Sequence, residues 1–284
     1  MTKYAIGIIG GTGNMGQWFN SFFTEAGHKV LISGRQTAIT TENIAETCDI
    51  VIISTPTDAA IRICKIIGPL LSENQLLMDF CSLKERIVDK MAESTRAAVI
   101  GTHPMFGPDT ESIKGRNVVI CPVKNSRWID WLENLLSSKG AEVTRMDPAV
   151  HDRNMAVVQG LTHLLTICMG KTLQKLNMTP NLVNSCSTPI FKLNMDLLGR
   201  LFSQDLDLYS NLIGKNAYMK DALEIFSNAL NEGEECLLYG SNGEKRSYLE
   251  EIREFLGDFC QTGFIESNKA LNIIYPNKKP DPKG

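Results

Sequence analysis

A histidine in the first half of the chain stands in a segment suited to proton transfer. Residues 101–109 read Gly-Thr-His-Pro-Met-Phe-Gly-Pro-Asp and follow a predicted strand at residues 97–101. His103 would then lie at the carboxyl end of a strand, where parallel sheets bind their ligands. An imidazole titrates near neutrality, so it can accept a proton there, although a purely structural histidine is the alternative. Pro104, Gly107 and Pro108 stiffen the following loop, which favours a fixed position for His103 as a candidate general base.

Three further polar side chains are candidates for substrate contacts. Ser82 and Lys84 follow a predicted strand at residues 76–79. Ser82 could bind the substrate or orient His103, whereas Lys84 could pair with a carboxylate or be solvated, as most lysines are. Arg200 lies in an otherwise apolar segment, where it is either paired structurally or presented to an anionic ligand. His163, on an apolar helical face, fits a core histidine better than a catalytic one.

A glycine-rich loop near the N-terminus has the spacing of a dinucleotide-binding turn. It follows a predicted strand at residues 4–9, opens an amphipathic helix, and precedes a second strand that ends near Ser33. The first glycine would make the tight turn, the second would admit a pyrophosphate, and the third would let the helix pack on the sheet. A glycine-rich turn without a ligand is the alternative. The expected cofactor contacts in this loop are Gly11, Thr12, Gly13, Asn14, Met15 and Gly16, and those at the end of the third predicted strand are Ser54, Thr55 and Pro56.

The end of the second predicted strand favours NADP over NAD. An NAD site usually presents an acid here to bind the ribose hydroxyls. This chain has Ser33-Gly34-Arg35, and no acid occurs between Glu25 and Glu42. A guanidinium can bind a 2′-phosphate through charge-assisted hydrogen bonds. The alternative is that Arg35 is a solvated surface residue and that both cofactors are used.

The order of apolar patterns predicts two domains. Short apolar runs alternate with amphipathic stretches up to Asp147, as in βαβ units, and long helix-period segments follow. We therefore expect an α/β fold with an N-terminal Rossmann-type dinucleotide-binding domain (residues 1–147) and a C-terminal all-helical domain (residues 148–284). The predicted strands cover residues 4–9, 29–33, 50–54, 76–79, 97–101, 117–121 and 142–146, and the predicted long helices residues 151–176, 180–201, 205–231 and 244–266.

Composition excludes several classes of protein. The net charge of −3 over 284 residues gives no electrostatic basis for binding nucleic acid or an anionic membrane. The eight cysteines include no CxxC pair, so we expect free thiols in a reducing cytoplasm and no metal site. Residues 1–4 lead directly into a strand-like segment, so no secretory leader is expected.

Taken together, the sequence motifs of this chain resemble those of the prephenate dehydrogenase (TyrA) family of tyrosine biosynthesis. The resemblance rests on the glycine loop, residues 79–84, the HPMFGPD string at 103–109 and the HDxxM string at 151–155. It continues through QGLTH at 159–163, TPIFKL at 188–193 and GRLFSQDLDLY at 199–209. Related β-hydroxyacid dehydrogenases share the architecture but are not expected to carry these strings.

The resemblance implies a reaction and a role for each candidate residue. Members of the family oxidise and decarboxylate prephenate to 4-hydroxyphenylpyruvate, with hydride transfer to the nicotinamide. His103 would accept the proton of the ring hydroxyl, and Ser82 would complete the catalytic site. Arg200, Lys84 and Gln204 would bind the substrate, and the helical domains would form a homodimer. The only other partner expected is the small-molecule substrate.

The sequence departs from the family pattern in places and leaves the substrate open. Lys192 stands where some relatives have a second arginine, and the segment around Arg35 differs from the acidic end of NAD-using members. No chorismate mutase bundle is expected before the glycine loop and no regulatory domain after residue 265, so we expect a monofunctional core. Arogenate and 4-amino-4-deoxyprephenate are alternative substrates, and an imine or β-hydroxyacid reductase and a non-catalytic NADP(H) sensor are less favoured alternatives.

Overall fold

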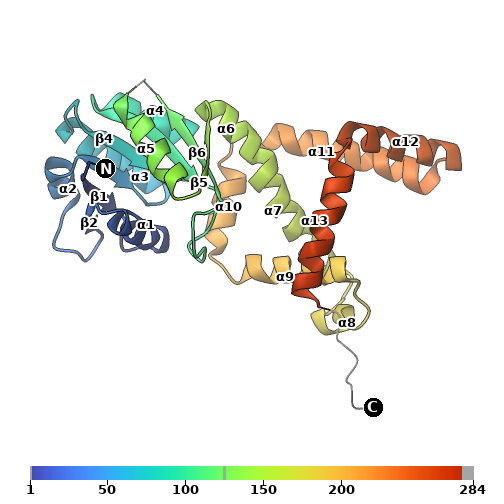
Figure 1. The fold of residues 1–284 in the computed structure, drawn as a ribbon. Coiled ribbons are helices and arrows are strands. Elements are labelled where there is room, and N and C mark those ends of the chain that lie inside the picture. The colour runs from blue at the N-terminus through green and yellow to red at the C-terminus, as the bar shows by residue number, and fades with distance from the viewer. Residues whose placement is uncertain (1, 124–125, 277–284) are drawn as a thin grey trace, which may run out of the picture. The chain divides into compact units, whose positions relative to one another are not determined.

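The chain divides into two compact units, Met1–Met155 and Ala156–Gly284 (Figure 1). The computed structural model describes residues 2–123 and 126–276. The first unit is α/β and the second is helical, so the predicted fold class is confirmed.

The α/β unit is built on one sheet. Over the described residues its strand order is β2-β1-β3-β4-β5-β6-β7, and every pairing is parallel except that of β5 with β6. The predicted strands agree closely with these elements, except that β5 continues to Pro104. The strands are β1 (Ala5–Ile9), β2 (Lys29–Ser33), β3 (Ile50–Ile53), β4 (Leu76–Asp79), β5 (Ala98–Pro104), β6 (Asn117–Pro122) and β7 (Glu142–Arg145).

Helices cover both faces of the sheet. Strands buried on both sides explain why β3 and β4 read as continuous apolar runs rather than alternating ones. One core contains Phe19 of α1 (Asn14–Glu25) and Trp128 of α5 (Arg127–Ser138). The other core contains side chains of α2 (Thr41–Thr47), α3 (Thr57–Ile67) and α4 (Glu85–Ser94). A 3-10 turn η1 (Gly68–Leu70) follows α3, and α6 (Pro148–Met155) ends the unit.

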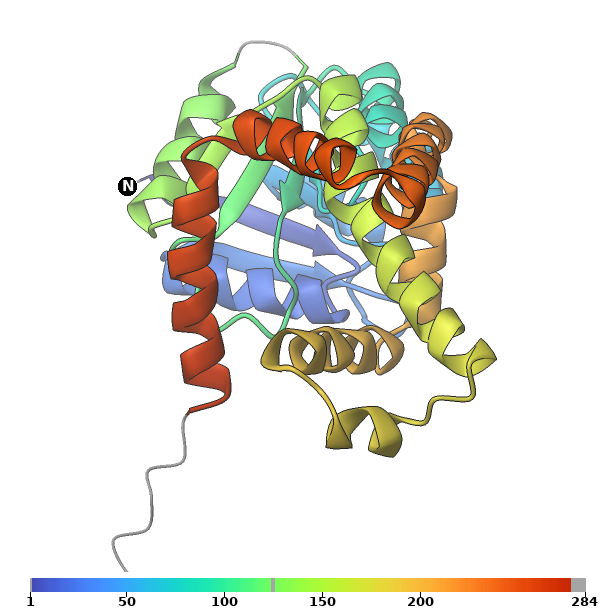
Figure 2. The same ribbon diagram turned by 90° about the vertical axis from the view of Figure 1, so that its right-hand side faces the viewer.

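Three of the predicted long helices are each interrupted in the helical unit. Thr188 caps α9 through its side chain, Pro189 begins that helix, and Gly257 (φ 53°) ends α12, where the chain turns before α13 (Figure 2). The elements are η2 (Ala156–Leu161, a π-helix), α7 (Thr162–Lys175), α8 (Pro180–Ser185), α9 (Pro189–Phe202), α10 (Leu206–Gly214), α11 (Met219–Glu234), η3 (Glu235–Tyr239, a π-helix), α12 (Asn242–Leu256) and α13 (Phe259–Ile274).

Two global properties follow from the described residues. Within residues 2–123 and 126–276, no helix combines the length and the apolar character needed to cross a bilayer. The cysteines all lie in these ranges and carry free thiols, as the sequence predicted. The four in the α/β unit are buried: Cys48, Cys64, Cys81 and Cys121.

Candidate active site

His103 lies on a part of β5 that extends beyond its parallel neighbour. The pairing of β4 with β5 ends at Asp79 opposite Gly101, and residues 102–104 pair with β6 instead. His103 is therefore at the carboxyl edge of the parallel strands, as predicted, although it is inside the strand rather than in the following loop. Its side chain is only 3% exposed.

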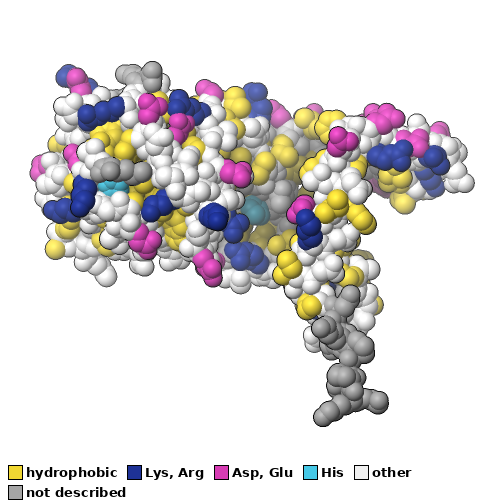
Figure 3. All heavy atoms as spheres, viewed as in Figure 1, with side chains coloured by type: hydrophobic (Ala, Val, Ile, Leu, Met, Phe, Trp, Pro, Cys, Tyr) yellow, Lys and Arg dark blue, Asp and Glu magenta, His cyan; other side chains and the backbone are white. Residues whose placement is uncertain are grey.

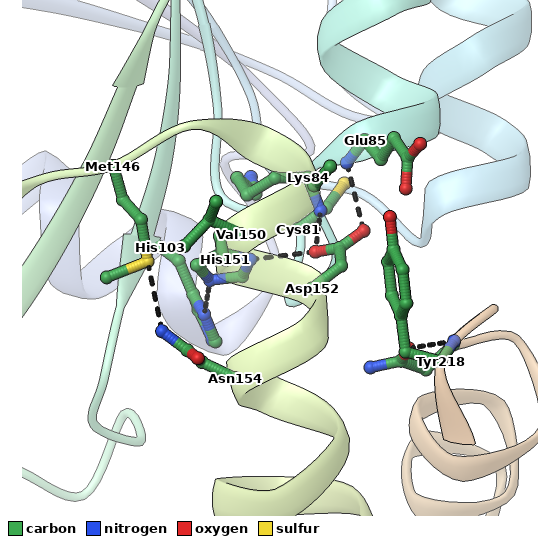
Figure 4. A network of polar contacts seen from close by, with 12 residues as sticks. Cys81, Lys84, Glu85, His103, Met146, Val150, His151, Asp152, Asn154 and Tyr218 are labelled. Carbon is green, nitrogen blue, oxygen red and sulfur yellow. Dashed lines mark hydrogen bonds and ion pairs between the residues drawn. The ribbon is translucent and has the colours of Figure 1, made fainter. Parts of the chain in front are cut away.

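A chain of polar contacts runs from His103 to the start of α4 (Figure 4). His103 Nδ1 lies 2.9 Å from His151 Nε2, and His151 Nδ1 lies 2.7 Å from Asp152 Oδ1. The Asp152 carboxylate accepts the backbone N–H of Lys84 at 2.7 Å and that of Glu85 at 3.0 Å. Residues from β5, α6 and the β4–α4 connection thus meet in one network within the α/β unit.

His151 and Asp152 were not among the residues to which a role was assigned from the sequence. Both residues occur in the HDxxM string that supports the family resemblance, but their adjacency in sequence does not predict contact with a histidine 48 positions away. The only available signal was the pairing of an acid with an imidazole at the start of a helix.

Burial makes His103 a neutral imidazole near neutral pH. Its pKa is lowered well below 6.5, first because burial disfavours the charged form, and then because Lys84 and His151 lie nearby. A neutral imidazole has a lone pair, so His103 can accept a proton at pH 7. This is the protonation state that a general base requires.

Lys84 occupies a buried position rather than an exposed one. Its side chain is 0% exposed, and its ammonium pairs with the Asp79 carboxylate and donates to the Thr102 carbonyl at 3.0 Å. Asp79 also accepts the backbone N–H of Cys81 at 2.8 Å. Lys84 therefore pairs with a carboxylate of the protein and is not solvated. The burial of Lys84 argues against the expected direct contact with substrate.

Ser82 and Cys81 follow β4 at the carboxyl edge of the sheet. Ser82 is partly exposed, and among the described residues it makes no hydrogen bond to His103. The Cys81 thiol donates to the Thr55 carbonyl at 3.5 Å, and burial raises the pKa of this thiol strongly. Cys81 therefore has the character of a structural, unreactive thiol.

The glycine loop joins β1 to α1 at the carboxyl edge of the sheet. The residue of this turn with positive φ is Gly10 (φ 82°), not Gly11, and a Cβ on Gly11 would lie 2.6 Å from Ile32 Cβ. A Cβ on Gly16 would lie 2.6 Å from the Gly10 carbonyl oxygen, so this glycine allows the helix to approach the loop. The first glycine of the motif thus packs against β2 rather than supplying the left-handed residue.

The loop has an exposed helix N-terminus that fits a phosphate group. Thr12, Gly13 and Asn14 are exposed, and Gly13 caps α1 without any side-chain hydrogen bond. The backbone N–H groups of the first helical turn are the usual donors to a dinucleotide pyrophosphate. Met15, by contrast, packs against the core beneath the loop.

The segment after β3 lies beside the glycine loop. The Ser54 N–H donates to the Ile9 carbonyl at 2.7 Å, and a Cβ on Gly10 would lie 2.3 Å from the Ser54 carbonyl oxygen. Thr55 follows, and Pro56 begins α3. Strand order reverses between β1 and β3, and such a switch point is where open α/β sheets bind nucleotides.

Arg35 is exposed at the tip of a short turn after β2. The Gly34 N–H donates to Thr37 Oγ1 at 2.9 Å, and this hydroxyl donates to the Ile39 carbonyl at 2.9 Å or to that of Gly34. A Cβ on Gly34 would lie 2.5 Å from Thr12 Oγ1, so this turn adjoins the glycine loop. Ser33 is buried, whereas Arg35 presents its side chain to solvent.

Arg200 and Gln204 lie at the end of α9 in the helical unit. Arg200 is exposed, and the Gln204 amide oxygen accepts a hydrogen bond from Tyr209 Oη at 2.7 Å. The Tyr209 ring packs edge-on against His163, with centroids 4.9 Å apart. Burial lowers the pKa of His163 and raises that of Tyr209. His103 and Arg200 therefore belong to different units.

Family models match most of the chain. A model described as the prephenate dehydrogenase nucleotide-binding domain matches residues 26–145, and one described as the prephenate dehydrogenase dimerization domain matches residues 147–254. A probable arogenate/prephenate dehydrogenase of Methanocaldococcus jannaschii is 33% identical over 95% of this chain and 65% of its own length. The T-protein of Haemophilus influenzae is 30% identical over 94% of this chain and 71% of its own length.

Solved structures with the same fold are more distant in sequence. The prephenate dehydrogenase of Aquifex aeolicus, in complex with hydroxyphenyl propionate and NAD+, superposes with a TM-score of 0.70 at 22% identity. The alignment covers 89% of this chain and 97% of that one. An arogenate dehydrogenase of Synechocystis gives a TM-score of 0.70 at 17% identity, over 87% of this chain and 96% of that one.

Proposed function

Because the chain belongs to the prephenate dehydrogenase family of NAD(P)-dependent oxidoreductases, we propose that it converts prephenate to 4-hydroxyphenylpyruvate with NADP as the preferred cofactor. The observation that carries this proposal is the position of His103. A neutral, buried imidazole lies at the carboxyl edge of the same sheet whose first strand leads into the glycine loop. Arogenate and 4-amino-4-deoxyprephenate are the alternative substrates.

The residues of the α/β unit fit a dinucleotide. The exposed N-terminus of α1 suits the pyrophosphate, and the residues after β3 flank it across the strand-order switch. Arg35 is proposed to bind the 2′-phosphate of NADP, because its turn adjoins Thr12 of the glycine loop and carries no acid. When bound, the cofactor supplies the hydride acceptor.

His103 is proposed to accept the proton of the ring hydroxyl as the hydride leaves the carbon that bears this hydroxyl. Negative charge develops on that oxygen, so a positioned base accelerates the step by about 10²–10⁴-fold. The bond from the ring to its carboxylate then breaks, carbon dioxide leaves, and the ring becomes aromatic. Arg200 and Gln204 of the helical unit are proposed to bind the substrate, Arg200 through a carboxylate. Ser82 is proposed to contact the hydroxyl beside His103.

Initial rates test this function directly. Prephenate, arogenate and 4-amino-4-deoxyprephenate should each be offered with NAD and with NADP, and prephenate with NADP should give the highest kcat/KM. The variant His103→Asn should bind NADP normally and lose about 10²-fold or more of kcat. Turnover of none of the three ring acids would reject the proposal, and faster turnover of arogenate would replace the substrate.

A homodimer formed through the helical unit is part of the proposal. Large apolar side chains are exposed on α12 and α13, with Phe255 88% and Ile273 80% exposed (Figure 3). Apolar side chains of this size are normally covered, and the model matched to residues 147–254 is that of a dimerization domain. Sedimentation equilibrium should give twice the chain mass of 31.5 kDa. The free thiols of the described cysteines suit the cytoplasm as the proposed compartment.

A further inference from the structure

We propose that His151 and Asp152 are positioning residues that fix His103 in the tautomer protonated on Nδ1. In that tautomer the lone pair of His103 lies on Nε2, the ring nitrogen that does not contact His151. The tautomer assignment depends only on contacts within the α/β unit. Its catalytic meaning, that Nε2 is the atom that takes the substrate proton, rests on the function proposed above.

The direction of these hydrogen bonds follows from the Asp152 carboxylate, at which the series of contacts ends. A carboxylate only accepts, so His151 must donate to Asp152 from Nδ1 at 2.7 Å. A neutral His151 then has its lone pair on Nε2, where it can accept from His103 Nδ1–H at 2.9 Å. Each neutral imidazole thus carries one proton on Nδ1, and both donate toward Asp152.

The fold holds Asp152 in place, so the series of hydrogen bonds from His103 through His151 ends at a fixed carboxylate. Its two oxygens accept backbone N–H groups from Lys84 and Glu85, at the start of α4. These donors belong to the first turn of a helix, where N–H groups lack intrahelical partners and the helix dipole favours an anion. The carboxylate is therefore held by backbone atoms rather than by a mobile side chain.

The opposite arrangement would require a buried cation. If His151 were doubly protonated, its Nε2–H would donate to His103, which would then carry its proton on Nε2 and could not accept there. Within the described part of the α/β unit, the charged groups seen beside the pair include the Lys84 ammonium with its partner Asp79, and Asp152. The backbone N–H groups of Lys84 and Glu85 already stabilise the Asp152 anion, so two neutral imidazoles leave no buried charge without a partner and add no second cation beside Lys84.

Nitrogen NMR of the unmodified enzyme tests the tautomer without substrate. The chain has four histidines, so a spectrum of protein labelled with 15N in the imidazole rings is simple to assign. His28 is an internal reference, because its Nδ1 accepts the Tyr4 N–H at 3.2 Å and its proton must then lie on Nε2. His103 and His151 should both show the Nδ1–H pattern. An Nε2–H pattern for His103 would overturn the proposal.

Substitution of Asp152 tests whether the hydrogen bonds from His103 through His151 to Asp152 set the tautomer of His103. In Asp152→Asn an NH₂ in the place of Oδ1 would donate to His151 Nδ1, while the amide oxygen in the place of Oδ2 would keep the Glu85 N–H and the Lys84 N–H would lose its acceptor. Both imidazoles should then move their proton to Nε2, and kcat should fall by about 10²–10⁴-fold with little change in KM for NADP. The matched control Asp89→Asn, at an exposed position on α4, should alter neither the NMR pattern nor kcat.

Two substitutions of His151 separate positioning from packing. His151→Gln places an amide oxygen that can accept from His103 Nδ1, whereas His151→Phe fills the space without an acceptor. The glutamine variant should retain the Nδ1–H pattern of His103 and more of kcat than the phenylalanine variant. Equal losses in two variants that melt at the wild-type temperature would reject a positioning role.

The two proposals fail in distinguishable ways. If His103 shows the Nδ1–H pattern but none of the three ring acids is oxidised, the tautomer stands and the function falls. If prephenate is oxidised while His103 is protonated on Nε2, the function stands and the positioning chain is wrong.

Discussion

The Lys84 ammonium donates to the carbonyl of Thr102 at 3.0 Å, directly before His103 in β5. The same ammonium pairs with Asp79 at the end of β4, so one buried cation ties the ends of two strands together. The strand segment that carries His103 is thereby held at the point where it leaves its parallel neighbour. The role of Lys84 that the structure supports is to position this segment.

Removing that cation should destabilise the α/β unit. In Lys84→Met the Asp79 carboxylate stays buried without its partner, which costs about 3–5 kcal/mol. The double variant Lys84→Met/Asp79→Asn removes both charges and should recover most of that loss, since an amide oxygen still accepts from Cys81. Urea unfolding measures both values, and a single variant as stable as the wild type would contradict the buried pair.

The pH dependence of turnover should reflect the lowered pKa of His103. Because burial, Lys84 and His151 lower this pKa well below 6.5, the neutral base persists as the pH falls through 6.5. Activity should therefore be lost only at a pH clearly below that of a free imidazole. A profile of log kcat/KM for prephenate measures the acid limb, and a midpoint at or above 6.5 would show that His103 is not the titrating base.

Cofactor preference should depend on Arg35. Arg35→Ala removes the proposed charge-assisted bonds to a 2′-phosphate and should weaken NADP binding by about 10–100-fold, with NAD binding nearly unchanged. Arg62→Ala, a basic residue on α3, is a control of equal charge change. Fluorescence titration of both cofactors gives the comparison. Equal losses for NADP and NAD would remove the preference.

Substrate affinity should depend on Arg200 in the helical unit. Arg200→Ala should raise KM for prephenate by about 10²-fold and leave the Kd of NADP within error, because its proposed partner is a substrate carboxylate. Arg246→Ala, an exposed arginine on α12 paired with Glu250, should change neither constant. A larger effect on NADP than on prephenate would place Arg200 elsewhere in the mechanism.

The sheet was predictable because its sequence pattern is strong. Strands such as β3 are buried on both faces, so their apolar runs stand out from the flanking polar turns. The end of β5 was missed, since the antiparallel pairing of His103 with Val119 depends on a partner that local sequence does not reveal. The helices between the strands were predicted as amphipathic stretches without individual bounds, and the structure shows that Thr40 forms a capping box at the start of α2.

The helical unit was predicted in outline and not in its breaks. Helical periodicity continues across Thr188-Pro189 and Gly257, so it suggested longer helices than the chain forms. The cap, the proline and the glycine were visible signals, whereas the π-helical turn Ala156–Leu161 had none. The domain boundary at residue 147 stays a prediction; α6, which follows it, packs with α4, and the compact units divide after Met155.

The candidate site was likewise predictable from the sequence only in part. Individual residues such as His103 and the glycine loop follow from motif and strand position, which are local properties. The contact of His151 with His103, and the burial of Lys84, depend on how α6 and α4 pack against β5. Tertiary packing sets these environments, and no spacing rule in the sequence encodes it.

Asp152 serves two purposes with one carboxylate, as the acceptor for His151 and as the N-terminal cap of α4. An engineer who wishes to alter the acid–base chemistry of this scaffold therefore cannot redesign that position freely. Any replacement has to accept hydrogen bonds from the first turn of α4 as well as from the imidazole, which leaves very few acceptable side chains. A screen for activity at this position therefore also selects for folding.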